Sequence, residues 1–395
     1  MKRFICLLVL LWFTLPAVAP AQGVDISGYF EPQYMGLSLN GKWLQLQSNK
    51  LRVDLNSEIA DNVRFAANVN FITYHGRKEW DILDFLPKTV TAGIPTAYLP
   101  AFQFAYRDSF YLDNAYLFIH LPLLDLTVGR QQISLGTGYA WNPTDLFNTK
   151  MLIDPTYEQP GHNAVRADIP LMGDFSLMIL YQPERSLTHS AGFARLKGRV
   201  GHFDFSLSAA QKDWTFSDYQ PIYQYGLPVI APEKRQMIGA DVAGELFGVG
   251  VWAEGAYNKM ERSGDFNEWL FGADYTWESG FYLMGEFYHN SRLPANYRKV
   301  TLSQWMQFIS AQLKTIARDQ LYLYASYPLT DLLNINLSAV YCPRDNSAGL
   351  IPMLQYSIYE NLDLIAISQF YLGKEGTAFA GNLGNGGLVR LRYYF

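Results

Sequence analysis

Apolar and polar residues alternate with a period of two through most of this sequence. In residues 52–59, Val53 and Leu55 fall on one face of an extended chain, whereas Arg52 and Asp54 fall on the other. Because successive side chains of a β-strand point to opposite sides, this pattern predicts strands with one apolar and one polar face.

Following the alternation along the chain predicts about eighteen strands, with sixteen to twenty as the range. Their spans are 24–37, 42–60, 63–75, 110–121, 125–136, 163–170, 174–183, 190–200, 203–214, 235–246, 249–260, 267–277, 281–291, 318–327, 333–342, 348–358, 362–373 and 386–395. So many amphipathic strands in one chain favour an all-β fold, a transmembrane antiparallel up-and-down β-barrel.

The connections between these strands alternate between two classes. Every second connection is short, as at Asp61-Asn62 and Phe247-Gly248. The long ones lie near 76–108, 137–162, 215–234, 292–317 and 374–385. Short turns on one side and long loops on the other are typical of outer-membrane barrels, and a soluble sandwich has no reason to separate its connections in this way.

Residues 1–21 have the organisation of a secretory signal peptide. A basic pair precedes an apolar run over residues 4–15, which is too short to span a membrane as a helix. Residues 19–21, Ala-Pro-Ala, supply the small residues that a signal peptidase recognises. We therefore expect cleavage before Gln22, and a single barrel domain over residues 22–395 in the outer membrane of a Gram-negative cell.

The composition agrees with strands that face lipid on one side only. Hydrophobic residues make up 49% of the chain, yet the mean hydropathy is −0.05. The net charge of −5 is too small to favour a nucleic-acid partner. Beyond the signal the only cysteine is Cys342, which excludes an intrachain disulfide and a cysteine-based metal site, and we expect no cofactor.

The last predicted strand carries a further pattern. Residues 388–395, LVRLRYYF, alternate in polarity and end in Phe395. This ending resembles the C-terminal strand of outer-membrane proteins, and the resemblance implies recognition by the barrel-assembly machinery. The lipid bilayer would then be the surrounding partner, and homo-oligomerisation is left open by the pattern.

Charged residues on the predicted lumen side form two groups. The basic group comprises Arg52, Arg64, Arg166, Arg195, Lys197, Arg199, Arg390 and Arg392, and the acidic group comprises Asp204, Asp241, Glu245, Glu254, Asp274 and Glu286. Because a closed barrel places its last strand beside its first, we expect a basic wall and an acidic wall with a field between them that orients polar solutes. The alternative is that these charges only keep the lumen wet and pair locally, as Arg166 and Asp168 would.

The segment 137–162 is the most distinctive connection, and it is the third on its side. Gly129-Arg130-Gln131 before it and Asn142-Pro143-Thr144-Asp145 within it resemble a segment of porin-like barrels related to the alginate-export family, although Leu135 stands where a tryptophan is expected. In classical porins the third external loop narrows the pore. We therefore expect a pore-constricting loop at 137–162, in which Asp145 and Asp154 meet the basic wall. In the alternative, the segment caps the barrel and both carboxylates form local turns.

Together these features predict a porin or channel for small hydrophilic or charged solutes, and not an enzyme. One alternative is a phospholipase-like enzyme, because His289 and Ser291 have the spacing of outer-membrane phospholipases, but the Asn-Gly that follows in that family is missing here. A second alternative is the barrel sheath of an electron conduit around a multihaem cytochrome. The chain has no CXXCH motif of its own, so the haem would belong to the partner.

Overall fold

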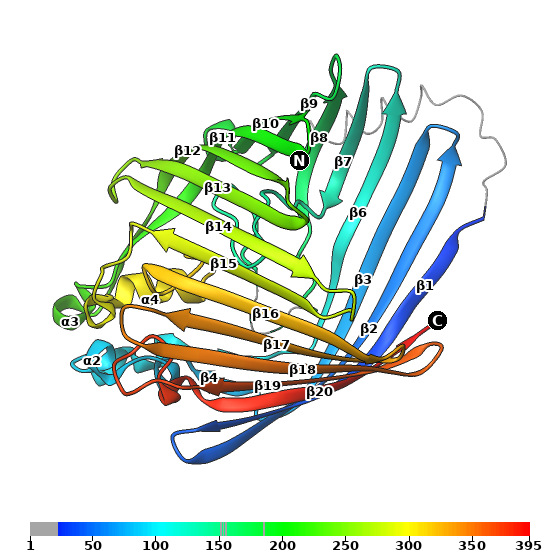
Figure 1. The fold of residues 1–395 in the computed structure, drawn as a ribbon. Coiled ribbons are helices and arrows are strands. Elements are labelled where there is room, and N and C mark those ends of the chain that lie inside the picture. Colours follow the sequence, from blue (N-terminus) through cyan, green and yellow to red (C-terminus); the bar gives the residue numbers. More distant parts are fainter. Residues whose placement is uncertain (1–22, 151, 153, 155, 185) are drawn as a thin grey trace.

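The computed structural model describes residues 23–395 except 151, 153, 155 and 185, so the expected signal peptide lies outside the described residues. Eighteen strands form one antiparallel sheet, and β20 (Asn385–Tyr394) pairs with β1 (Asp25–Leu39) to close it (Figure 1). The predicted β-barrel is confirmed. In the described part of the chain, no helix is both long and apolar enough to span a membrane.

The barrel strands follow one another around the ring in chain order. After β1 come β2 (Lys42–Ala60), β3 (Val63–Gly76), β6 (Ser109–Leu121), β7 (Leu124–Gln131), β8 (His162–Pro170), β9 (Ser176–Gln182), β10 (Ala191–Val200), β11 (Phe203–Asp218), β12 (Val229–Leu246), β13 (Val249–Met260), β14 (Phe266–Thr276), β15 (Tyr282–Asn290), β16 (Asp319–Thr330), β17 (Leu333–Cys342), β18 (Ser347–Tyr359), β19 (Leu362–Tyr371) and β20.

Two strands differ most from their predicted spans. β12 begins at Val229 whereas the alternation predicted 235–246, and β7 ends at Gln131 whereas it predicted 125–136. Beyond Gln131, Ile133 and Leu135 are buried in a hydrophobic cluster with Phe193 and Met237 of the wall. The alternating pattern there reflects packing against the lumen wall and not a continued strand.

The outer face of the barrel is apolar. Leu207, Ile238 and Phe271 expose 59%, 71% and 55% of their surface on the outside, whereas their neighbours Ser206 and Asp241 are buried on the inside. Because lipid would contact this outer face, exposed apolar side chains are the expected surface of a membrane barrel.

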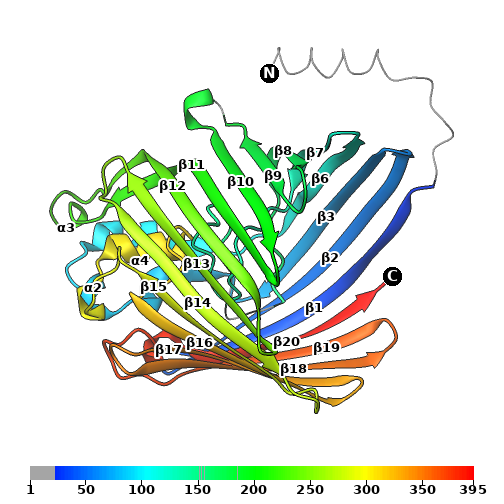
Figure 2. The same ribbon diagram turned by 45° about the horizontal axis from the view of Figure 1, so that its top comes forward.

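The connections separate between the two ends of the barrel (Figure 2). At one end, here called the turn end, the connections are short, as at 61–62, 201–202 and 360–361. The other end, the loop end, carries the long connections, among them 77–108, 132–161, 219–228, 291–318 and 372–384. This confirms the two predicted classes of connection.

The long connections contain short elements that the alternation did not predict. They are β4 (Glu79–Asp81), η1 (Ile82–Phe85), α2 (Lys88–Thr91), η2 (Thr96–Phe102), β5 (Gln103–Ala105), η3 (Leu187–His189), α3 (Ile222–Tyr225), η4 (Tyr297–Lys299), α4 (Leu302–Ile309) and η5 (Gly381–Leu383). α4 begins with a capping box in which Thr301 and Gln304 bond each other's backbone N–H.

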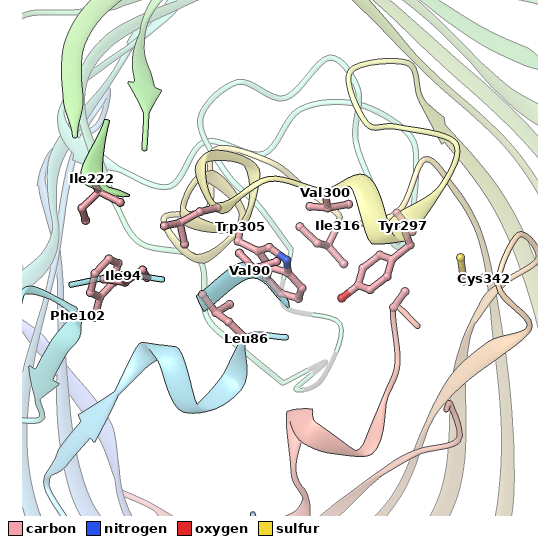
Figure 3. Close-up of a cluster of buried hydrophobic side chains, with 13 residues drawn as sticks. Leu86, Val90, Ile94, Phe102, Ile222, Tyr297, Val300, Trp305, Ile316 and Cys342 are labelled. Atoms are coloured by element: carbon pink, nitrogen blue, oxygen red, sulfur yellow. The ribbon is translucent and has the colours of Figure 1, made fainter. Parts of the chain in front are cut away.

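These connections pack against one another at the loop end. Leu86 and Val90 of one connection, Ile222 of another and Trp305 of a third share a buried hydrophobic cluster, which Cys342 of β17 also joins (Figure 3). The loop end is therefore covered by a folded layer that has its own core.

Candidate functional site

The described residues of the connection 132–161 run inside the barrel and bond to two separate parts of its wall. Its residues 137–144 bond to β13 and β15, and its residues Asp154 and Glu158 bond to β1, β2 and β20. Around the ring, the strands β16–β19 lie between these two sets on one side, and the strands from β3 to β12 lie between them on the other. We call residues 132–161 the crossing loop.

Two carboxylates of the barrel wall bind the backbone of residues 137–144 of the crossing loop. Glu254 accepts hydrogen bonds from the backbone N–H groups of Thr137 at 2.7 Å and Thr144 at 2.6 Å. Glu286 accepts from the N–H groups of Tyr139, Ala140 and Trp141 at 2.7–3.0 Å. Carboxylates that receive several N–H groups make strong charge-assisted bonds, and these fix the path of the loop.

The Asn-Pro-Thr-Asp residues of the crossing loop fasten it internally. Asn142 donates from Nδ2 to the Leu135 carbonyl at 2.7 Å, and Asp145 accepts from the N–H groups of Leu135, Phe147 and Asn148 at 2.8–3.2 Å. Asp145 thus acts as a local turn former, and not as a partner of the basic wall.

Gly138 of this segment lies so close to neighbouring atoms that a side chain would not fit. A Cβ on Gly138 would lie 1.9 Å from the Trp141 carbonyl oxygen and 2.6 Å from a Leu270 methyl group, so no larger residue fits there without a shift. Trp141 is itself buried and stacks on Tyr288 of β15 at a centroid distance of 5.0 Å.

Ion pairs from Asp154 and Glu158 attach the other part of the crossing loop to the wall. Asp154 accepts a bond of 2.6 Å from Arg390. Glu158 contacts Lys50 at 2.8 Å and Arg52 at 2.9 Å, and it also accepts from the Tyr29 hydroxyl at 2.9 Å. Burial opposes the ionised form of Glu158, but the two cations outweigh it and lower the pKa of this carboxyl.

The basic residues predicted for the lumen are mostly paired with acidic ones. Arg195 forms a two-armed contact with Asp241, with both distances near 3 Å, and also bonds Ser206. The remaining pairs are Arg52–Asp54, Arg166–Asp168, Lys197–Asp204, Arg199–Asp204 and Arg392–Glu31. These charged residues therefore form local ion pairs. In the Arg195–Asp241 pair, a residue of the predicted basic group contacts a residue of the predicted acidic group.

Three predicted lumen residues have other surroundings. The Arg64 guanidinium lies 5.8 Å from the centroid of the Phe118 ring. Asp274 accepts a hydrogen bond of 2.8 Å from the Tyr282 hydroxyl, and Glu245 is exposed near the turn end.

A buried polar cluster on the wall was not singled out in the sequence. Glu268 accepts bonds from Arg235 at 3.1 Å and from Tyr288 at 2.5 Å, and Lys314 lies 3.7 Å away. Arg235 and Glu268 both occupy the polar face of their strands, so the alternation contains the signal for them. Lys314 lies in a loop and had no such signal.

Residues of the crossing loop line two cavities of different character. The polar chamber, of about 670 Å³, is on the turn-end side and is lined by charged and amide side chains such as Arg52, Asn68 and Arg166. The apolar chamber, of about 610 Å³, is on the loop-end side and is lined by side chains such as Ile351 and Leu388.

The suspected catalytic pair is engaged in other contacts. His289 bonds Asp319 from Nδ1 at 2.6 Å, and Asp319 also contacts Arg344. Ser291 accepts a hydrogen bond from the Asn267 backbone N–H. In the described part of the chain no hydrogen bond joins His289 to Ser291.

No family model matches the sequence, and no curated protein matches it. Many solved structures match, and several do so over nearly the whole chain. Three of these are Acinetobacter baumannii OccAB4 (10% identity, TM-score 0.56, 95% of this chain and 98% of that one), A. baumannii OccAB2 (8%, 0.56, 94% and 98%) and Pseudomonas aeruginosa OccK11 (11%, 0.55, 94% and 96%). At such low identity the likeness concerns the fold alone, and the fold is that of outer-membrane porins and channels.

Proposed function

We propose that this protein is an outer-membrane channel for small hydrophilic or charged solutes, in which the crossing loop narrows the lumen. The observation that carries the proposal is the attachment of one loop to both walls, through Glu254 and Glu286 on one side and Arg390 on the other. A segment held at both sides of a pore reduces its free cross-section, which sets the size of solute that passes.

The lining of the polar chamber supports the proposal that the solutes are hydrophilic or charged. Arg52 and Arg166 line it together with Asp54 and Asp168, and amides such as Asn68 lie between them. Side chains of both signs and neutral amides can replace part of the hydration shell of a polar solute inside a narrow passage.

Planar-bilayer recordings of the refolded protein test the proposal. The wild type should form channels, and deletion of residues 140–158 should raise the single-channel conductance, because the deletion removes the segment between the two walls. A matched control removes residues 224–227 at the tip of another long connection, where Tyr225 and Leu227 are exposed, and should leave the conductance unchanged.

The outcomes separate the readings of this loop. Equal conductance in the wild type and in the 140–158 deletion would contradict a constriction. A barrel that forms no channel in either version would contradict the channel itself, and the next search would then be for a haem-bearing partner. The sheath requires room in the lumen for such a partner, where the crossing loop now lies.

A further inference from the structure

The apolar chamber has a lining that an open polar lumen does not require. Inward-facing Val340, Ile351, Ile367 and Leu388 form its wall on β17, β18, β19 and β20. On the loop side, Trp305 contributes to the lining from α4. In an alternating barrel strand, these inward positions would ordinarily be polar.

The size of the chamber shows that this lining is not simply a packed core. Protein interiors contain few voids larger than a water molecule, and an apolar cavity of about 150 Å³ already binds benzene. A chamber of about 610 Å³ falls within the roughly 300–1,000 Å³ range of small-molecule sites.

Among the described residues, the charge on the lining comes from two ammonium groups. Lys150 and Lys314 both line the chamber, and in the described part of the chain no Asp or Glu does. Lys314 lies near Glu268, which offsets its charge. Lys150 donates to the carbonyl oxygens of Gly138 and Tyr139, and no carboxylate of a described residue lies within 4.0 Å of its ammonium.

We propose that the apolar chamber is a binding site for an amphipathic small molecule. Its hydrocarbon or aromatic part contacts Ile351, Ile367 and Leu388, and a single acceptor group lies beside Lys150. Apolar walls with one or two placed polar groups are the usual design of such sites. The inference rests on the proposed function, because the lumen is the route by which the molecule reaches the chamber.

Two fluorescent probes of matched shape test this site in protein reconstituted into lipid nanodiscs. They are the anionic 8-anilino-1-naphthalenesulfonate and the neutral N-phenyl-1-naphthylamine, with empty nanodiscs as the correction for lipid partition. The wild type should bind both with saturation at one probe per barrel. The double variant Ile351→Gln/Ile367→Gln should weaken both by roughly tenfold or more, because amide groups replace the apolar wall.

A conservative change in the polar chamber provides the matched control. Asn56→Gln lies in the same lumen on the turn-end side and should bind both probes as the wild type does. Lys150→Gln should weaken the anionic probe and leave the neutral probe unchanged. Heat-modifiable gel migration checks that each variant is folded, and displacement of both probes from the wild type by 1-decanol tests the site without any substitution.

The proposal is overturned if the wild type shows no saturable binding above empty nanodiscs, or if the folded double variant binds both probes as the wild type does. Conductance without saturable binding would remove this site and keep the channel. Saturable binding in a barrel that never conducts would keep the site and remove the channel function.

Discussion

Glu254 and Glu286 bind backbone N–H groups of the crossing loop, where a lumen carboxylate would ordinarily be expected to meet a cation or water. Glu286 also accepts a hydrogen bond of 2.7 Å from the Trp252 indole. Such a carboxylate does not depend on loop side chains for recognition, because it bonds the main chain. It does require the loop backbone to present several N–H groups to one point, and this fixes the conformation of the loop.

Replacing Glu286 with Gln should loosen the crossing loop. The neutral amide accepts weaker bonds and directs its NH₂ group at backbone donors. Since hydrogen bonds to charged groups contribute roughly 1.5–3 kcal/mol, opening of the loop should become easier by about 2 kcal/mol, or roughly thirtyfold. Hydrogen exchange at the amides of residues 139–141 measures this directly.

The control for this substitution is Glu245→Gln, because Glu245 is exposed and its carboxylate forms no hydrogen bond with any described residue. It should leave the protection of residues 139–141 unchanged. Equal protection in Glu286→Gln and the wild type would mean that other contacts hold the loop.

The sequence placed these residues on the correct face but could not identify their partners. Alternation alone puts Glu254, Glu286 and Arg390 on the polar side of their strands, and the structure places all three in the lumen. Their partners are backbone N–H groups and loop carboxylates, and no side-chain pattern records where a loop returns to the wall. For this reason Asp154 was expected to meet the basic wall of Arg52, Arg166, Arg195 and Arg199, whereas the basic residue that it contacts is Arg390, which the alternation had also placed in the basic group.

At the scale of elements, period-two alternation found all eighteen barrel strands, because one face contacts lipid along the whole strand. It did not find the structure of the loops, whose helices are short and whose core is shared among distant segments such as α3 and α4. The alternation also did not predict the apolar chamber. Inward residues such as Ile351 and Ile367 lie on strands that are apolar on both faces near the loop end.

The attachment of the crossing loop should depend on pH through Glu158. Its pKa is lowered from the ordinary value of 4.5 by Lys50 and Arg52, so its contribution to loop attachment is complete above that value and is lost as the pH falls through the lowered one. Single-channel current should therefore be steady above pH 4.5, and fluctuations should increase as the pH falls below that value through the lowered pKa of Glu158.

Glu158→Gln provides the control for the pH dependence. This variant should fluctuate at neutral pH as the wild type does in acid, because the two cations have lost their charged partner. If the acid step remains unchanged in Glu158→Gln, then another carboxylate is responsible, and Asp154 beside Arg390 is the next to test.

The whole molecule combines a closed wall with a folded interior. The wall is held by backbone bonds between every pair of neighbouring strands, which leaves no open sheet edge toward lipid. Inside it lie the polar chamber and the apolar chamber, and residues of the crossing loop line both. A solute that contacts both chambers in turn would need polar and apolar parts, which is what the proposed channel and the proposed apolar site together predict.

Closure of the barrel between its first and last strands can be tested by a disulfide across that seam. Tyr34 of β1 and Val389 of β20 are direct partners, and both face outward. Directly opposed residues of antiparallel strands have Cα atoms about 4.5–5.5 Å apart, which suits a disulfide. Oxidised Tyr34→Cys/Val389→Cys should therefore stay a covalent ring after boiling and migrate differently from the same protein after reduction.

The pair Tyr34→Cys/Leu207→Cys, on strands across the barrel, should show no such difference, and Cys342 is buried in every variant. If the seam pair fails to crosslink in a folded, heat-modifiable barrel, β1 and β20 are not neighbours in this register.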